Sequence, residues 1–154
     1  MRLQIQINKM AYADILTHIK KVAESHIFIN QVSSGDVYEE WNSGENLYPA
    51  INISPNSVNI NGHSISYVNF TMTYADRLKQ DESNKDLVQS NAIQVLTQIL
   101  QKVEEQGYTI GADYEITLYT QKFADLLAGG YAEVILYINY PIDEGCVDED
   151  YFNK

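Results

Sequence analysis

The chain has 154 residues, with ten Lys and Arg against 21 Asp and Glu and a formal net charge of −11. This length is sufficient for one domain whose core needs no disulfide or metal ion, and the acidic excess argues against a protein that holds nucleic acid through clustered Lys and Arg. Cys146 is the only cysteine, which excludes an internal disulfide and a cysteine-rich metal site.

The N-terminal part combines an alternating stretch with an amphipathic helix. Apolar and polar residues alternate from Met1 to Ile7, which predicts a short strand or an extended arm that docks elsewhere. A helix is predicted from about Lys9 to Ser25, with Asn8 as its cap. Its apolar residues recur at steps of three and four: Tyr12, Ile15, Leu16, Ile19, Val22 and Ala23.

The next two stretches predict a short strand and a long loop. Residues 26–32 are apolar and β-branched, as is typical of a strand. Residues 33–48 contain two glycines, four acids and three aromatics without a regular period, so we expect an exposed loop. Trp41, the only tryptophan, either anchors this loop on the domain or contacts a neighbouring molecule, and the anchor is the more common role.

A hairpin is predicted between Pro49 and Ala75. Two short strands flank a turn at 54–56, and Asn61-Gly62 is the dipeptide that favours a type I′ hairpin turn. In the long return strand, from about Ser64 to Ala75, the apolar residues change phase. We therefore expect a bulge or bend near Val68-Asn69, and the strand could project beyond the sheet.

The clearest periodicity lies between Asp76 and Gly107. Residues 76–84 have no apolar period and predict an acidic loop, whereas Lys85 to Gln106 predict a helix capped by Ser83 or Asn84. The opposite helix face carries mostly amides and hydroxyls and could face solvent or a partner. The predicted core face consists of Val88, Ala92, Val95, Leu96, Ile99, Leu100 and Val103.

The C-terminal part predicts two further strands, at Asp113 to Tyr119 and Tyr131 to Tyr140, joined by a corner at 121–130. The fold class is therefore α+β, with a mixed, mainly antiparallel sheet and two helices packed on one face. This single domain covers residues 1–141, and an acidic tail follows at 142–154.

No catalytic or cofactor motif is present in the sequence, so we expect no enzyme activity, cofactor or bound metal. His18 and His26 match no metal-ligand spacing, and the acids near 76–86 lack the glycine turn and closing glutamate of a calcium loop. No signal peptide or span of about 20 apolar residues is evident, which favours a cytoplasmic protein without a membrane contact. Twelve tyrosines favour an assembly subunit.

Two segments together resemble a family of phage proteins. The stretch from Tyr74 to Leu100 contains Asp76-Arg77, Ser83-Asn84 and Gln89-Ser90, and Asp125 to Gly129 reads DLLAG before the last strand. This combination resembles the small neck or tail-completion proteins of tailed bacteriophages, particularly those of Bacteroidetes, including crAss-like phages. The resemblance covers roughly the C-terminal half of the chain.

The resemblance implies a fold similar to tail terminators and a closed ring of six or twelve copies in the virion, between portal and tail. Its partners would be other phage neck, portal or tail proteins, with assembly in the host cytoplasm. An acidic lumen would let DNA pass without specific binding. The residues expected to line it are Asp76, Asp81 and Glu82, with the acidic tail as an alternative.

The expected contacts between subunits lie on the return strand, by β pairing along 64–75, and on the preceding loop. The candidate interface residues are Trp41, Tyr67, Phe70, Met72 and Tyr74. Two alternatives to a ring subunit stay open. One is a cytoplasmic enzyme or small-ligand-binding α+β domain that uses His18, His63 and loop carboxylates, and the other is an adaptor that binds one partner through the Tyr/Trp loop.

Overall fold

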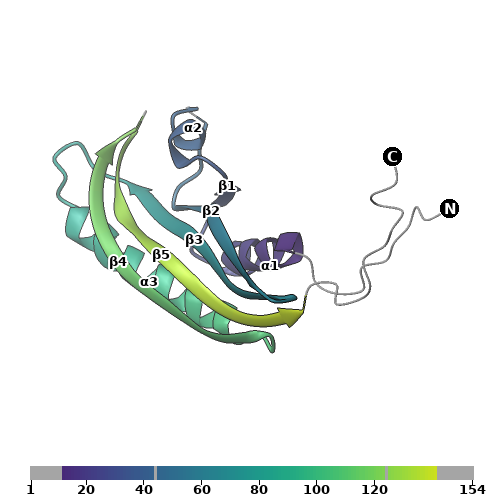
Figure 1. The fold of residues 1–154 in the computed structure, drawn as a ribbon. Helices are drawn as coiled ribbons and strands as arrows, with labels where there is room; N and C mark the ends of the chain where they lie inside the picture. Colours follow the sequence, from purple (N-terminus) through teal and green to yellow (C-terminus); the bar gives the residue numbers. More distant parts are fainter. Residues whose placement is uncertain (1–11, 44, 124, 142–154) are drawn as a thin grey trace, which may run out of the picture.

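The computed structural model describes residues 12–43, 45–123 and 125–141 (Figure 1). The alternating stretch at 1–7 and the acidic tail at 142–154, with Cys146, lie outside these residues. In the described part, no helix is long and apolar enough to cross a membrane. The elements in chain order are α1 (Tyr12–Ser25), β1 (Gln31–Ser34), α2 (Val37–Trp41), β2 (Ala50–Asn61), β3 (Ser64–Arg77), α3 (Lys85–Glu104), β4 (Thr109–Lys122) and β5 (Leu126–Pro141).

The five strands form one mixed sheet in the order β1-β2-β3-β5-β4. Only β1 and β2 are parallel, and the other three pairs are antiparallel. The long strands are bent along their length, and α3 runs along the outside of the bend (Figure 1). The predicted α+β class, with a mainly antiparallel sheet and the two long helices on one face, is confirmed.

The main core lies between the two long helices and the sheet. All seven residues predicted to form the core face of α3 are buried, and α1 buries Ile15, Ile19 and Ala23. The sheet contributes alternate residues, because successive side chains of a strand point to opposite faces. These residues are Ile51 and Ile53 of β2, Ile65, Val68, Phe70, Met72 and Tyr74 of β3, and Ala128, Ala132, Val134, Leu136 and Ile138 of β5.

The segment before β2 differs from the sequence prediction. Residues 26–30 turn instead of forming a strand, with the Ile29 amide donating to the His26 carbonyl, and β1 begins only at Gln31. The predicted loop contains α2, whose N-cap Asp36 accepts from the amides of Tyr38 and Glu39. An acidic cap residue followed three positions later by Glu is a helix start signal, and residues 36–39 carry it although a loop was predicted here.

The hairpin is present, but its irregularities lie elsewhere than predicted. β2 runs through residues 54–56 as a strand with an extra residue at Asn56 rather than a turn. The hairpin turn is Gly62-His63, and only Gly62 of the pair has a positive φ, of 65°, which fits type II′ rather than I′. The bulge in β3 is at Ser66, two residues before the predicted position.

β3 is a central strand over its whole length. It pairs with β2 from Ser64 to Ala75 and with β5 from Ser64 to Arg77. Both of its hydrogen-bonding sides are therefore used within the chain. The expectation that 64–75 projects from the sheet and pairs with another subunit is wrong, because pairing with β5, which is distant in sequence, occupies that side.

The predicted corner at 121–130 is mostly strand. β4 continues to Lys122, and β5 already begins at Leu126, so Gly129 and Gly130 lie inside a strand. A Cβ atom at Gly129 would overlap the carbonyl oxygen of Tyr74 on the neighbouring strand. Glycine is thus required here by the close approach of two strands and not by a turn.

We expect Gly129→Ala to lower the free energy of unfolding by about 2 kcal/mol or more, because the added methyl group meets backbone that cannot rotate away. Urea denaturation followed by circular dichroism measures this loss. Gly111→Ala is the matched control, since Gly111 also lies in a strand and its added Cβ would meet no atom within 4 Å. Equal effects of the two changes would contradict the close approach at Gly129.

Candidate functional site

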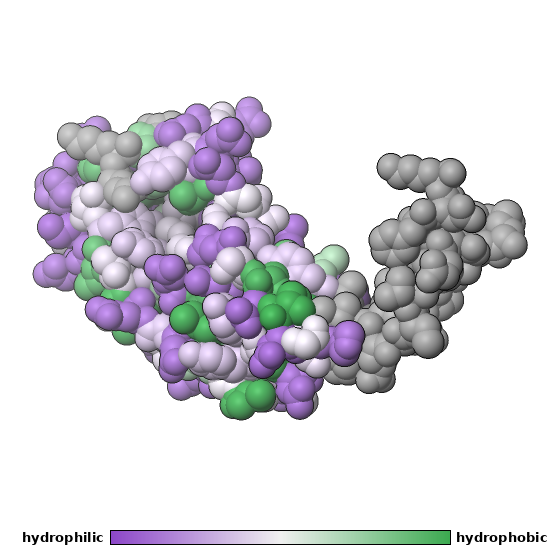
Figure 2. All heavy atoms as spheres, in the orientation of Figure 1, coloured by the Kyte–Doolittle hydropathy of each residue, from purple (hydrophilic) through white to green (hydrophobic). Residues whose placement is uncertain are grey.

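The sheet face opposite α1 and α3 is largely uncovered, and we call it the open face. Its residues follow from the strand register, which places Asn52, Thr73, Tyr131 and Thr117 in one row across four strands. Figure 2 shows hydrophilic and hydrophobic residues interspersed on the side that it draws. Other members of the open face are Ser54, Tyr67, Asn69, Thr71, Asp113, Glu115, Glu133, Ile135 and Tyr137.

One end of the open face is covered by α2. Trp41 is fully buried there in a second cluster with Ala50, Ala75 and Leu127. Its ring lies 5.5 Å from that of Phe123, in an edge-on arrangement. Trp41 therefore anchors α2 on the sheet and is not available to a neighbouring molecule, which corrects its place among the interface candidates.

Three more interface candidates are core residues. Phe70, Met72 and Tyr74 have no exposed surface, because the bulge at Ser66 turns the even-numbered positions that follow it toward the helices. Tyr67 alone stays partly exposed, and its ring lies 6.2 Å from that of Tyr137 on the open face. Of the five candidates, only Tyr67 can contact another subunit without rearrangement of the core.

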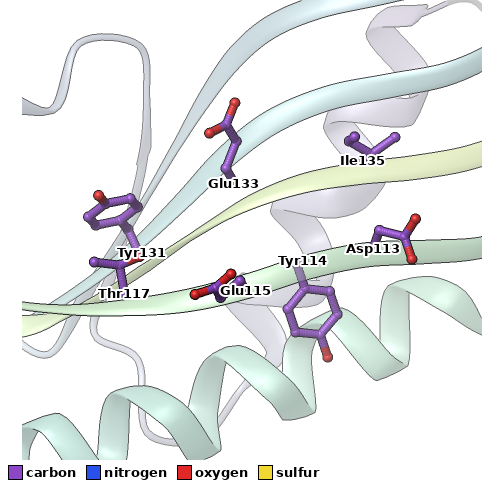
Figure 3. Close-up of a pocket in the computed structure, with 7 residues that line it drawn as sticks. All are labelled: Asp113, Tyr114, Glu115, Thr117, Tyr131, Glu133 and Ile135. Carbon is purple, nitrogen blue, oxygen red and sulfur yellow. The ribbon is translucent and has the colours of Figure 1, made fainter.

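The open face carries three carboxylates, Asp113, Glu115 and Glu133. Glu115 of β4 lies directly opposite Glu133 of β5, and Figure 3 shows them on neighbouring strands. Tyr137 donates to Asp113 Oδ2 over 2.9 Å, whereas no Lys or Arg pairs with any of the three among the described residues. Like charges directly opposite each other destabilise a sheet. A partner with a basic group or a polyvalent cation would reduce the repulsion between these carboxylates.

Positive charge is scarce on the strands. Their sequences contain only Arg77 and Lys122, and the side chain of Lys122 lies outside the description. Arg77 is at the α2 end, where its guanidinium lies 3.5 Å from Asp125 and 5.2 Å from the centre of the Tyr48 ring. The acidic part of the open face is therefore uncompensated by the described strand residues.

Two shallow depressions occupy the open face and share Tyr131. The larger has a volume of about 590 Å³ over β4 and β5, and Tyr114 at its edge turns toward α3 (Figure 3). The smaller, of about 240 Å³, lies between α2 and the sheet beside Thr71 and Thr73. The hydroxyl groups, aromatic rings and carboxylates that line the two depressions are suited to reversible contact with a polar ligand or partner. Among the described residues, no group of three or more His, Cys, Asp or Glu could hold a metal ion.

The acids predicted to line a lumen gather at the end of β3, separate from the three on the open face. Asp81 and Glu82 are exposed in the turn before α3. The Ser83 amide donates to Asp81 Oδ1 over 3.0 Å, and this hydrogen bond lowers the pKa of Asp81. Asp76 is partly buried, and burial raises its pKa. Asn84 holds the turn, accepting from the Lys79 amide and donating to the Arg77 carbonyl.

The histidines proposed for a ligand site are not brought together with these acids. His63 is exposed in the hairpin turn, and the 14 residues of β3 separate it from Asp81. At about 3.3 Å per residue, that is roughly 45 Å of strand. His18 lies on α1 with its ring edge-on to that of Tyr108, at 6.4 Å. Burial and then Lys21 lower the pKa of His18.

Sequence reasoning missed the carboxylates of the open face. The signal was present at Glu115, which alternates with Tyr114 and Ile116 in a predicted half-buried strand. Glu133 was less conspicuous, because the strand around it is apolar. That the two carboxylates lie opposite each other depends on the register of β4 and β5, which neither segment specifies alone.

Tyr119 closes the α2 end of this surface. Its hydroxyl donates to the Tyr74 carbonyl over 2.7 Å, and its ring is tilted against that of Tyr131. Burial, followed by the neighbouring phenols of Tyr48, Tyr38 and Tyr74, raises the pKa of Tyr119 above its usual range. The unionised phenol is thus part of the folded structure.

We expect Tyr119→Phe to lower the free energy of unfolding at neutral pH by about 1 kcal/mol, because a buried carbonyl loses its donor. A raised pKa in the folded state contributes stability below the unfolded value of about 10, and this contribution is lost as pH rises further. The wild type should therefore lose more stability between neutral and alkaline pH than the variant. The free energy of unfolding of each protein is measured by denaturation at several pH values. If the difference between the wild type and the variant does not change with pH, the raised pKa of Tyr119 in the folded state is contradicted.

We expect Glu133→Gln to raise the free energy of unfolding by about 0.5 kcal/mol at low salt, since it removes repulsion with Glu115. Added salt should reduce the gain through screening. A double-mutant cycle with Glu115→Gln provides the control, because the second change should add little once the first has removed the repulsion. Fully additive effects would show that the two carboxylates do not interact.

A scan of the chain against models of protein families and a search of curated proteins each found no match. The function of the open face is therefore inferred from its own geometry, charge and chemistry.

Proposed function

We propose that the chain is a structural virion protein that forms an oligomeric ring in the head-to-tail connector of a tailed phage. The observation that carries this proposal is the open face, a sheet surface with three carboxylates that pair with no Lys or Arg among the described side chains. A surface of like charge prevents DNA from adhering as it passes. The ring then acts as a conduit through shape and charge, without catalysis.

The position in the neck or tail comes from the sequence resemblance of the C-terminal half. The fold also supports ring formation, because the two outer strands, β1 and β4, lie at opposite edges of the sheet and present different surfaces. A contact between unlike surfaces, repeated around an axis, closes into a ring. We propose six or twelve copies, in contact with portal, neck or tail proteins.

A small-ligand-binding role is the second candidate, and the larger depression on the open face favours it. Its volume of about 590 Å³ falls within the usual range of ligand sites, about 300 to 1,000 Å³. A ligand there would carry positive charge or several hydroxyl groups, to satisfy Asp113, Glu115 and Glu133. A monomer that retains a small molecule in native mass spectrometry would favour this role.

Native mass spectrometry or light scattering of the purified chain tests the ring. We expect a closed oligomer of six or twelve copies, and imaging of phage particles should place it between portal and tail. If the chain is monomeric at all concentrations and absent from particles, the connector role is excluded.

Charge reversal tests which acids line the conduit. We expect Glu115→Lys with Glu133→Lys to slow DNA ejection while rings still form, because cations on the conduit wall would bind phosphate. Asp81→Lys with Glu82→Lys is the matched pair beyond the end of β3, at the acids that the resemblance implies for the lumen. If only one of the two double variants slows DNA ejection, the acids changed in that variant line the conduit. If neither variant slows ejection while rings still form, an electrostatic role of these acids in DNA passage is excluded.

A further inference from the structure

We propose that the free side of β4 is completed by residues 1–7 of a second copy of this chain, added as a further strand. The proposal concerns contact between copies only and does not depend on a role in the virion. It rests on three features: the length of the unpaired edge, the chemistry on its two sides, and the alternation of the N-terminal residues.

The edge is long and accessible. β4 has 14 residues and is the last strand in the sheet order, so it pairs only with β5 among the described strands. An outer strand presents unpaired N–H and C=O groups that can pair with another chain. Proteins protect such edges with a very short strand, proline, bulges or charged side chains. β4 is long and contains no proline, and its protection is limited to Asp113, Glu115 and Lys122 and to the register shift at 109–111.

On the helix side, the edge is flanked by exposed apolar residues. Leu118 has 42% of its surface exposed, and its Cδ2 lies 3.3 Å from the position of a Cβ at Gly130, in the row that faces α3. Ile93 of α3 is 45% exposed. It follows Gln89 by one helical turn, and Gln89 donates to the Tyr119 carbonyl of β4, so Ile93 lies beside this edge.

On the other side, the edge is acidic. Asp113 and Glu115 of β4 project from the open face, and Glu133 lies next to them on β5. A strand that pairs with β4 would therefore need apolar side chains toward α3 and polar or basic side chains toward the open face. Because side chains alternate along a strand, such a segment must have a period of two.

The first residues of the chain have this pattern. Leu3, Ile5 and Ile7 alternate with Arg2 and two glutamines. With the apolar set toward α3, the added strand would cover Leu118 and Ile93. The same register would bring Arg2 to the open face, where its charge is complementary to the three carboxylates.

The fold favours a second copy as the source of this strand. α1, which follows the N-terminal segment, packs against β1, and its Leu16 and Lys20 line a depression together with Ile53 of β2. In Figure 1, α1 lies behind β2 and β3, whereas β4 is at the other side of the sheet. An arm from one side that binds the opposite side of the next copy forms a repeated, head-to-tail contact.

Two lysine substitutions in the full-length chain test the proposal. We expect Ile5→Lys to weaken self-association at least about tenfold. The free energy gained by burying an isoleucine side chain on binding is larger than the free energy that corresponds to a tenfold change in affinity. Gln4→Lys is the matched control, since it adds the same charge on the side facing the carboxylates and should preserve or strengthen association. Native mass spectrometry over a dilution series measures both.

A mixing experiment identifies the source of the strand. Ile93→Lys impairs the edge but leaves the N-terminal segment intact, and Ile5→Lys does the reverse. At a concentration where the wild type associates and each variant alone is monomeric, their mixture should form one-to-one dimers and nothing larger, because each such pair retains one intact contact. A monomeric wild type, equal effects of the Ile5 and Gln4 changes, or failure of the mixture to pair would overturn the proposal. Rings that persist in Ile5→Lys would overturn it while leaving the proposed ring function intact.

Discussion

The packing of α3 against the middle of the sheet is the constraint on which the other features depend. Seven apolar side chains of α3 are buried, against the alternate residues of β3 and β5 that face the helices. Once these residues point inward, strand geometry requires their neighbours to point outward. The open face, with its hydroxyls and carboxylates, is thus the necessary counterpart of the core. Its polar character explains how one side of the sheet can stay in contact with water.

A small number of residues near the α2 end bring three strands into close contact. Gly129 allows β5 to approach Tyr74 of β3 so closely that no side chain fits between them. Tyr119, directly opposite Gly129 on β4, donates its hydroxyl to the same Tyr74 carbonyl. Trp41 and Phe123 then pack at this end of the open face. One end of the surface is therefore closed and apolar, whereas the rest is open and acidic.

This division gives the molecule three distinct surfaces. The helix side covers the core, the open face is acidic, and the outer side of β4 pairs with no described strand and lies next to Leu118 and Ile93. In the proposed ring, the open face would meet DNA and the outer strands would meet neighbouring copies. The two roles are compatible because the hydrogen bonds of a strand lie in the plane of the sheet, whereas its side chains stand perpendicular to that plane.

The sequence alone determined the elements whose signal is local. The periodicity of α3 predicted each of its buried residues, and the alternation around Tyr114 and the position of Gly62 predicted a strand and a hairpin. It also predicted two helices on one face of a mainly antiparallel sheet. The tertiary structure decided which strands are central. Pairing of β3 with β5 joins distant residues, from Arg77 with Leu127 to Ser64 with Pro141, and no local pattern encodes such a partner. That pairing makes β3 a central strand and leaves β4 at the edge, and the separate register of β4 on β5 places Glu115 opposite Glu133.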